Sequence, residues 1–368
     1  MDATTVSGPG RQLAALVPHL AASGVDVKVV LFQRTGRPKP PYADFLADAG
    51  IPHVVLRENG RFDATLLGKV SELLAGWAPH IVQTHSYRPT AIAYALRRRG
   101  AAWRWVAFFH GTTNENLKVR LYHWIDRKLV RAADRIVVMS RAQADLFGGI
   151  GAQVRQIHNA VLADPGSARL PDTVARRIEA VGRPRLGVIG RLSHEKGVDI
   201  FLDAFRLLAD RGIAAGAVIA GDGPERERLA VQAARLGVAG SVHFLGAVHP
   251  ADPLYPELDL VVIPSRSEGL PNVLLEALSA GRRVVSTDVG AVTEVLEDAA
   301  AGRVVPARDP VALADAIAAG LAEPVEAGAD ARRVAVDRFS IERRRAAHVA
   351  LYEEVTKRAS PRVPELAS

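Results

Sequence analysis

The stretch LDLVVIPSRSEGLPNVLLEALSAG, residues 258–281, joins three kinds of local sequence in a fixed order. The run LDLVVIPS is β-branched and apolar, which is typical of a strand buried on both faces of a sheet. A loop rich in Gly and Pro follows, and the apolar run after it predicts a helix. Pro271 suits the first turn of that helix, and Asn272 could cap it. The stretch therefore predicts a strand–loop–helix unit whose loop lies at the positive end of a helix.

Two carboxylates in this unit, eight positions apart, are candidate binding groups. Glu268 lies in the loop, where backbone N–H groups can meet sugar hydroxyls or phosphate. Glu276 interrupts the apolar run VLLEAL, and a buried carboxylate needs a partner. That partner could be an Arg side chain, a backbone amide or a pair of ribose hydroxyls, and the pattern leaves these alternatives open.

The same alternation of short β-branched runs with longer amphipathic stretches extends along the chain. Helical stretches such as 11–24 and 90–100 separate the runs, which indicates an α/β fold with parallel sheets covered on both faces. The strands are expected at 25–32, 80–85, 103–110, 134–140 and 154–160, and then at 185–190, 216–221, 241–246, 258–265 and 282–288.

A length of 368 residues predicts about two domains. The segment 162–184 is rich in Pro, Gly and Ser and reads as a linker, although part of it could be helical. We expect an N-terminal Rossmann-like domain over 1–165, a C-terminal one over 166–339, a final helix over 340–358 and a disordered tail over 359–368.

The beginning of the chain departs from this pattern. The segment SGPGRQLAAL, 7–16, reads as a turn entering a helix, but only the short, polar MDATTV precedes it. The first strand of a doubly wound domain is central and should be a nearly continuous apolar run. We expect that the true start lies upstream or that residues 2–6 form a weak strand.

Two cations follow the first strand of the second half. The segment LGVIGRLSHEKGVDIF, 186–201, ends a strand at Gly190 and places Arg191 and Lys196 in the next loop, before a helix. Cations at the carboxyl end of a strand, beside a helix start, form a plausible diphosphate clamp. The alternative is a pair of solvated surface cations.

Two histidines end successive strands of the first half. His110 ends WRWVAFFH, and His85 ends HIVQTH. An imidazole there could exchange a hydrogen bond with a sugar hydroxyl, or it could serve the structure alone. The chain has no D-x-D and no H-E-x-x-H spacing, so these patterns indicate no metal site. The G-x-G turns at 7–13 and 220–229 lack the third glycine of a dinucleotide fingerprint.

Composition and charge set further bounds. The chain has no Cys, which fits a reducing compartment, and its start shows no signal-peptide pattern. No apolar run approaches the roughly 18 residues that span a bilayer. Residues 1–165 carry 21 Lys and Arg against 12 Asp and Glu, a net +9, and the remainder carries −2. This excess could be solvated helix faces, or it could attract an anionic membrane surface or a phosphorylated acceptor; no nucleic-acid motif accompanies it.

Taken together, these motifs resemble glycosyltransferase family four, a family of retaining enzymes with the GT-B fold of two Rossmann-like domains facing a central cleft. The resemblance covers most of the chain and is strongest from 186 to 310. Two departures are Arg283, where the family usually has proline, and Asn159-Ala160 in place of an Asn-Gly turn. The segments that carry the resemblance are GRLSHEKGVDIFLDAF, IAGDGPERERL, VHFLGAV, DLVVIPSRSEGLPNVLLEALSAG and VGAVTEVLED. The segments SGPGRQLAAL, FFHGTTNEN, ADRIVVMSRAQADLF and IHNAV match more weakly.

The resemblance implies how the nucleotide part of a donor would be held. Arg191 and Lys196 would bind the diphosphate, and Glu276 would bind the ribose. Gly8 and Gly10 would pass close to the diphosphate from the other domain. The final helix would cross back onto the first domain.

It also implies a sugar site. Glu268, with the backbone amides of Gly269 and Leu270 and next to Pro271, would contact the donor sugar. His110 would lie near the anomeric centre and contact the sugar's hydroxyls. Glu268 and His110 are therefore the residues that the resemblance places at the chemistry.

The implied activity is retaining transfer of a hexose or N-acetylhexosamine from a nucleotide-diphosphate sugar to a glycan or lipid-linked acceptor. It would serve polysaccharide, lipopolysaccharide or glycolipid synthesis, without a metal or other cofactor. The expected location is the cytoplasm, with peripheral contact to the inner face of the membrane. The alternatives are a sugar-nucleotide epimerase of the same fold, a non-catalytic sugar-nucleotide binder and, more remotely, a nicotinamide dehydrogenase.

Overall fold

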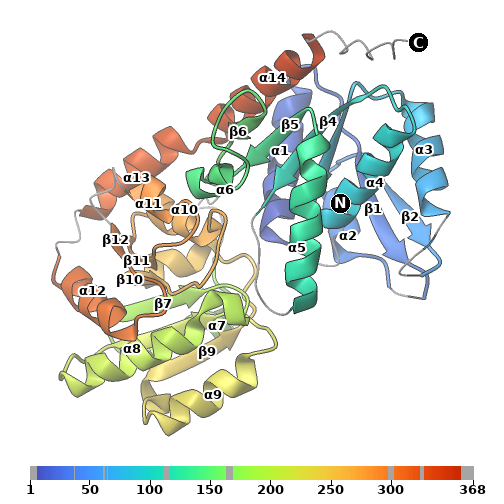
Figure 1. Ribbon diagram of the computed structural model, residues 1–368. Coiled ribbons are helices and arrows are strands. Elements are labelled where there is room, and N and C mark those ends of the chain that lie inside the picture. Colours follow the sequence, from blue (N-terminus) through green and yellow to red (C-terminus); the bar gives the residue numbers. More distant parts are fainter. Residues whose placement is uncertain are drawn as a thin grey trace, which may run out of the picture.

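The computed structural model describes residues 6–36, 38–60, 63, 65–110, 117–162, 169–296, 302–323 and 327–357. It has two α/β domains, shown in blue to green and in yellow-green to orange in Figure 1. The last helices, α13 and α14, run from the second domain back onto the first. The tail predicted over 359–368 lies outside the described residues.

The first domain contains two groups of parallel strands. The pair β1–β2 stands beside a four-stranded sheet of order β3-β4-β5-β6. The strands are β1 (Val29–Arg34), β2 (His53–Glu58), β3 (Ile81–His85), β4 (Arg104–Phe109), β5 (Arg135–Val138) and β6 (Val154–Gln156). The helices are α1 (Gly8–Ala21), α2 (Pro41–Asp48), α3 (Leu66–Trp77), α4 (Tyr87–Arg98), α5 (Leu117–Leu129) and α6 (Arg141–Asp145).

Two details of this domain differ from the sequence prediction. Strand β1 begins four residues later than expected, because 25–28 carries the charged Asp26 and Lys28. Strand β2 was missed: most of its residues are only partly buried, so its sequence lacks a strongly apolar run. Residues 2–5 of the expected first strand lie outside the described residues.

The second domain has one six-stranded parallel sheet of order β12-β11-β10-β7-β8-β9. Its strands are β7 (Arg185–Ile189), β8 (Gly216–Ala220), β9 (Val242–Gly246), β10 (Leu260–Ile263), β11 (Arg283–Thr287) and β12 (Gly302–Val305). Its helices and the crossing helices are α7 (Asp172–Glu179), α8 (Val198–Asp210), α9 (Arg226–Arg235), α10 (Asn272–Ser279), α11 (Val292–Leu296), α12 (Pro310–Ala322), α13 (Ala327–Arg338) and α14 (Ile341–Lys357).

This strand order is that of a doubly wound Rossmann sheet. The chain moves outward from β7 through β8 to β9, and then returns to the other side of β7 with β10. In such sheets the ligand crevice lies at the carboxyl ends of the two strands where the order reverses. The fold therefore predicts a site at the ends of β7 and β10. Strand β12 was not predicted, because two of its four residues are exposed at the edge of the sheet; α7 lies inside the predicted linker.

The final helix, α14, is bonded to the first domain. On α14, Glu354 accepts hydrogen bonds from Arg135 (Nη2–Oε1 2.6 Å) and Arg155 (Nη2–Oε1 2.7 Å). Tyr352 donates from its hydroxyl to Gln83 on β3 at 2.7 Å. Helix α14 also contacts α1. The last element is thus held to the first domain by charged and polar bonds as well as by apolar packing.

A buried polar cluster joins the domains at this crossing. The side chain of Gln12 of α1 forms two hydrogen bonds with the backbone of Ala160. It donates to the Ala160 oxygen at 2.8 Å and accepts from the Ala160 nitrogen at 2.9 Å. Asn159 donates to the side-chain oxygen of Asn272 at 2.8 Å, and Arg344 of α14 donates to Gln12 and Asn159. The capping role predicted for Asn272 is therefore wrong: its oxygen is used across the domain interface, and Pro271 precedes α10 without a side-chain cap.

The loop between β7 and α8 lies against the loop after β10 at one glycine. Gly197 has φ +63°, and a Cβ there would lie 2.0 Å from the carbonyl oxygen of Pro264. Only a residue without a side chain allows this approach. The contact brings the loop that carries Lys196 next to the loop that carries Glu268.

We expect Gly197→Ala to destabilise the protein by about 2–4 kcal/mol, the sum of a left-handed backbone and an overpacked contact. Gly212→Ala is the matched control, because Gly212 has φ +74° with nothing within 4 Å of the added Cβ, so only the backbone cost of about 1–2 kcal/mol applies. Urea unfolding of both variants measures the difference. Equal losses would contradict the assigned contact.

Candidate functional site

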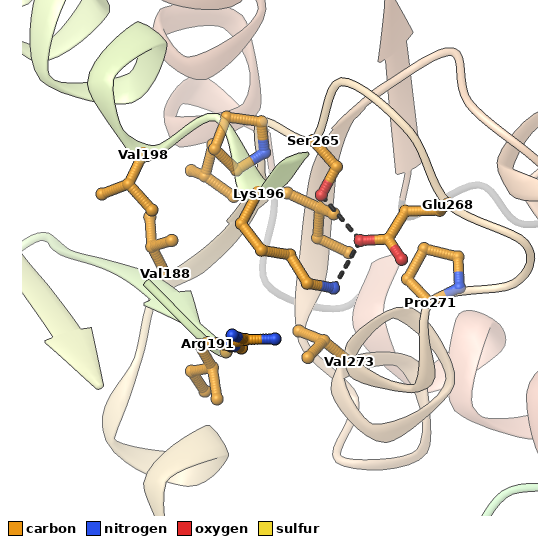
Figure 2. Close-up of a pocket in the computed structure, with 13 residues that line it drawn as sticks. Val188, Arg191, Lys196, Val198, Ser265, Glu268, Pro271 and Val273 are labelled. Atoms are coloured by element: carbon orange, nitrogen blue, oxygen red, sulfur yellow. Dashed lines mark hydrogen bonds and ion pairs between the residues drawn. The ribbon is translucent and has the colours of Figure 1, made fainter. Parts of the chain in front are cut away.

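The predicted crevice is lined by the loops that follow β7 and β10. Arg191 and Lys196 come from the first loop, and Ser265, Glu268 and Pro271 come from the second (Figure 2). The amino end of α10 follows directly, so its free N–H groups and positive end face the same region. Of the residues predicted for the site from these two loops, Arg191, Lys196, Glu268 and Pro271 are therefore brought together at one crevice.

The cations of this crevice differ in their partners. Lys196 forms an ion pair with Glu268 (Nζ–Oε1 2.5 Å), and the same oxygen accepts from Ser265 at 2.8 Å. Both bonds are drawn in Figure 2. Arg191 is exposed, and its guanidinium has no hydrogen bond or ion pair among the described residues. One cation is thus preset against the loop carboxylate, and the other is available to an incoming anion.

Glu276 is 6% exposed, and the structure gives it two neighbours. The hydroxyl of Tyr255 donates to Oε2 at 2.5 Å, and Arg11 of α1 lies 3.9 Å from Oε1. Burial raises the pKa of Glu276, and the bond from Tyr255 and the charge of Arg11 offset this only in part. Oε2 is therefore held by the protein, while Oε1 faces a more distant cation across the cleft.

The backbone of His110 contacts the Glu268 loop from the first domain. A Cβ on Gly269 would lie 2.7 Å from the carbonyl oxygen of His110 and 3.0 Å from Nε2 of Gln143. The loop of Glu268 and Gly269 therefore rests directly against the end of β4. Gln143 is 6% exposed, and its Nε2 has no hydrogen-bond partner among the described residues. Gln143 was missed by the sequence reasoning, since an isolated Gln on a short helix gives no signal.

The second candidate histidine pairs with the first. His85 Nδ1 and His110 Nε2 are 2.8 Å apart, and both rings stack with Phe108. Burial lowers the pKa of His110 to about 4 and, together with His110, holds the pKa of His85 well below its usual value. His348 of α14 also stacks on Phe108, and burial lowers its pKa to about 3. These imidazoles are neutral at pH 7.

The two glycines of the first loop have different neighbours. A Cβ on Gly8 would lie 2.9 Å from Nδ2 of Asn272, so the start of α1 lies against the start of α10. A Cβ on Gly10 would meet the ring of Tyr42 at 2.9 Å, which is a contact inside the first domain. Gly8 thus belongs to the cleft, while the described contacts of Gly10 are with the core.

Three further residues belong to this region although no motif indicated them: Arg11, Tyr255 and Gln143. Tyr255 lies in the segment DPLYPELD, where hydrophobic patterning marks it only as a core residue. Arg11 was visible as a cation next to the glycine loop, but its approach to Glu276 depends on how the domains meet.

Among the described residues, no three His, Asp or Glu side chains are grouped as a metal site requires. No described helix is long and apolar enough to cross a bilayer.

Solved structures share this architecture. The structure of Anabaena Alr3699/HepE in complex with UDP-glucose superposes with a TM-score of 0.80 at 19% identity, covering 96% of this chain and 98% of that one. The two Rossmann-like domains with a cleft at their switch point therefore have the GT-B fold, as the sequence predicted.

Sequence comparison then defines the family. Residues 7–160 match the family described as glycosyl transferase 4-like domain, and residues 183–323 match the glycosyl transferases group 1. The phosphatidyl-myo-inositol mannosyltransferase of Mycobacterium leprae is 31% identical over 265 residues, 68% of each chain. This chain belongs to the group 1 glycosyl transferases, glycosyltransferase family four. The alpha-D-kanosaminyltransferase of Streptomyces kanamyceticus is 32% identical over 210 residues, 55% of this chain, and the chain spans about half of that protein, 54%.

The neutral histidines predict how stability depends on pH. Their pKa values are lower in the folded state than the unfolded value of about 6.5, so the unfolded chain binds more protons as the pH falls below that value. We expect the free energy of unfolding to decrease from pH 7 to pH 5, by up to about 1.4 kcal/mol per pH unit for each histidine. Urea titrations at pH 7.5, 6.5 and 5.5 measure this.

The matched variant is His348→Asn, which keeps a donor for the carbonyl oxygen of Arg344 but does not titrate. The free energy of unfolding of this variant should decrease less steeply with falling pH than that of the wild type. The same slope in both proteins would contradict the assignment of a neutral, buried His348.

Proposed function

We propose that this protein transfers a hexose or N-acetylhexosamine from a nucleoside-diphosphate sugar to a glycan or lipid-linked acceptor, with retention of anomeric configuration. One observation carries the proposal. The Lys196–Glu268 pair and the unpaired guanidinium of Arg191 line one crevice at the switch point. The buried Glu276 lies on the helix that follows the Glu268 loop, and the backbone of His110 contacts that loop from the other domain. The names of the relatives, a mannosyltransferase acting on phosphatidyl-myo-inositol and a kanosaminyltransferase, support it.

The ribose of the donor binds to Glu276. Tyr255 already occupies one side of Oε2 and fixes the orientation of the carboxylate, which leaves Oε1 to accept from ribose hydroxyls. Arg11, 3.9 Å from Oε1, stabilises the ionised form of the carboxylate when the cleft is dry. A single carboxylate can accept from two adjacent hydroxyls at once.

The diphosphate binds to Arg191 and Lys196. The guanidinium of Arg191 has no partner among the described residues, so it is available to phosphate oxygens. Lys196 is held by Glu268, and a diphosphate would give it a second anionic partner. Negative charge grows on the diphosphate as it leaves, and preset cations stabilise that charge most in the transition state. The same cations replace a metal ion in this role.

The sugar lies between Glu268 and His110. The backbone amides of Gly269 and Leu270 and the carboxylate of Glu268 bond its hydroxyls, and His110 bonds it from the opposite side. The close approach of Gly269 to the carbonyl oxygen of His110 places the Glu268 loop next to the end of β4. The acceptor attacks from the face that the diphosphate leaves, which retains the configuration.

A donor-hydrolysis screen over UDP-, GDP- and ADP-sugars tests the proposal without knowledge of the acceptor. With the donor found, Glu276→Gln should weaken donor binding by about 1–3 kcal/mol, the range for a lost charged hydrogen-bond acceptor. Arg191→Ala and Lys196→Ala should lower kcat more than they raise KM, since they act on the leaving diphosphate. Calorimetry and steady-state rates measure both.

Glu227→Gln and Arg235→Ala, exposed changes on α9, are the matched controls and should behave as wild type. Tight donor binding with no turnover under any acceptor would instead indicate a sugar-nucleotide binder. Isomerisation of the donor sugar without acceptor would indicate an epimerase.

We also propose that the first domain contacts an anionic membrane surface, where a lipid-linked acceptor would lie. Its net charge is +9 over residues 1–165. On α5, Trp124 is 51% exposed and Ile125 is 36% exposed, and the ammonium of Lys128 lies 5.7 Å from the Trp124 ring centre. Aromatic and cationic side chains on one exposed helix are suited to the boundary between headgroups and acyl chains. Arg97, in contrast, is paired with Asp134 and adds little to this surface.

Co-sedimentation with vesicles tests the membrane contact. Recovery should require anionic lipid and fall with added salt, since each surface cation adds about 1 kcal/mol. Replacing Trp124 and Lys128 together with Ser should reduce recovery, while Arg235→Ser on the second domain should not. Equal recovery with neutral and anionic vesicles would remove the proposal.

A further inference from the structure

A chain of four hydrogen-bonding side chains runs from the crossing helix to the cleft. Tyr352 of α14 donates from its hydroxyl to Oε1 of Gln83 at 2.7 Å. Nε2 of Gln83 lies 2.8 Å from Nε2 of His85, and Nδ1 of His85 lies 2.8 Å from Nε2 of His110. Gln83 and His85 are two positions apart on β3 and so lie on the same face of the strand. This series of hydrogen bonds ends at His110, whose backbone contacts the loop of Glu268 and Gly269.

The direction of each bond in this chain follows from the orientation of the Gln83 amide, whose oxygen faces Tyr352 and whose nitrogen faces His85. The Gln83 carbonyl oxygen can only accept, so it takes the Tyr352 hydrogen, and the amide nitrogen can only donate. Nε2 of His85 must therefore accept, and a neutral His85 carries its hydrogen on Nδ1. That hydrogen is donated to Nε2 of His110. A neutral His110 then carries its own hydrogen on Nδ1, which has no partner among the described residues.

The surroundings keep both imidazoles neutral, as this argument requires. His85 is 7% exposed and stacks on Phe108 with a centroid distance of 4.7 Å. Two groups on α14, Arg344 and His348, face this cluster, and the positive charge of Arg344 disfavours a second positive charge on His85 or His110. No described carboxylate is bonded to either ring, so nothing favours an imidazolium.

We propose that Gln83 and Tyr352 are positioning residues that hold His110 in the Nδ1–H tautomer, so that His110 presents a hydrogen-bond donor, and not an acceptor, to a hydroxyl oxygen of the donor sugar. The sugar as ligand rests on the proposed function, while the tautomer is a property of the protein alone. A sugar hydroxyl bound in this way accepts from His110 and directs its own hydrogen elsewhere.

The same chain couples the cleft to the crossing helix. Tyr352 lies two residues before Glu354, which is bonded to Arg135 and Arg155 of the first domain. The orientation of the Gln83 amide therefore depends on the seating of α14. An amide turned the other way would present its oxygen to His85, and both histidines would reverse their tautomers. His110 would then offer an acceptor to the cleft.

The tautomer is read directly by long-range ¹H–¹⁵N NMR on the full-length protein labelled with ¹⁵N-histidine, without ligand. His110→Gln assigns the signal. The expected wild-type result is a neutral His110 with its hydrogen on Nδ1. A hydrogen on Nε2, or an imidazolium at pH 7, would overturn the proposal whatever the protein's activity.

Gln83→Met removes the amide and keeps the side-chain length, and it should give His110 a mixture of both tautomers. Tyr352→Phe frees the amide to turn, and it should also populate the second tautomer. Gln156→Met is the matched control, because Gln156, the last residue of β6, forms the same i,i+2 pair with His158 (Nε2–Nε2 2.8 Å) and does not contact His110. A single, unchanged tautomer in Gln83→Met and Tyr352→Phe would overturn the positioning role.

Donor hydrolysis supplies a second readout. Gln83→Met should lower kcat/KM for the donor sugar about tenfold, which is the loss of one hydrogen bond of about 1.4 kcal/mol. Its Kd for the nucleoside diphosphate without sugar should equal that of wild type, since His110 is assigned to the sugar. If no donor is turned over, the proposed function fails while the NMR result still decides the tautomer. Equal loss of sugar-free nucleotide binding would assign Gln83 a general structural role and contradict the proposal.

Discussion

Burial of three amide and guanidinium side chains at the meeting point of the two domains is the constraint on which the cleft depends. Gln12, Asn159 and Arg344 are each less than a tenth exposed, and they are bonded to one another and to Asn272. A buried polar group without a partner costs about 1–3 kcal/mol, so separating α1, α10 and α14 would leave several such groups unpaired. The cluster therefore favours one relative position of the domains.

The geometry of the site depends on this cluster, because α1 and α10 carry residues of the cluster as well as residues of the site. Asn272 and Glu276 are one turn apart on α10, and Gln12 and Arg11 are adjacent on α1. The position that pairs Gln12 with Asn272 also places Arg11 across from Glu276. A similar relation holds on the first domain, where α14 supplies Tyr352 to the chain of bonds that ends at His110. A displacement of α1, α10 or α14 would therefore change both the interdomain contacts and the positions of the binding groups.

Much of the fold was predictable because parallel strands buried on both faces need continuous apolar runs. The runs at 185–190, 216–221 and 258–265 became β7, β8 and β10 within a few residues. Strands β2 and β12 were missed because edge or half-buried strands do not need such runs. The placement of Arg191, Lys196 and Glu268 at one crevice was also predictable, since residues after the carboxyl ends of neighbouring parallel strands meet at one edge of the sheet.

By itself the sequence determined which residues follow which strands, and hence the family and the charged groups that follow β7 and β10. Only the tertiary structure decided their partners. Glu276 required a partner by its apolar context, but that the partner is Tyr255, 21 positions earlier, follows from packing. Asn272 had the local signature of a cap, and the domain interface took its oxygen instead. The hydrogen on His110 depends on Tyr352, whose bond to Gln83 spans 269 positions. Local patterns encode periodicity and burial, whereas the direction of a hydrogen bond depends on atoms that only folding brings within 3 Å of each other.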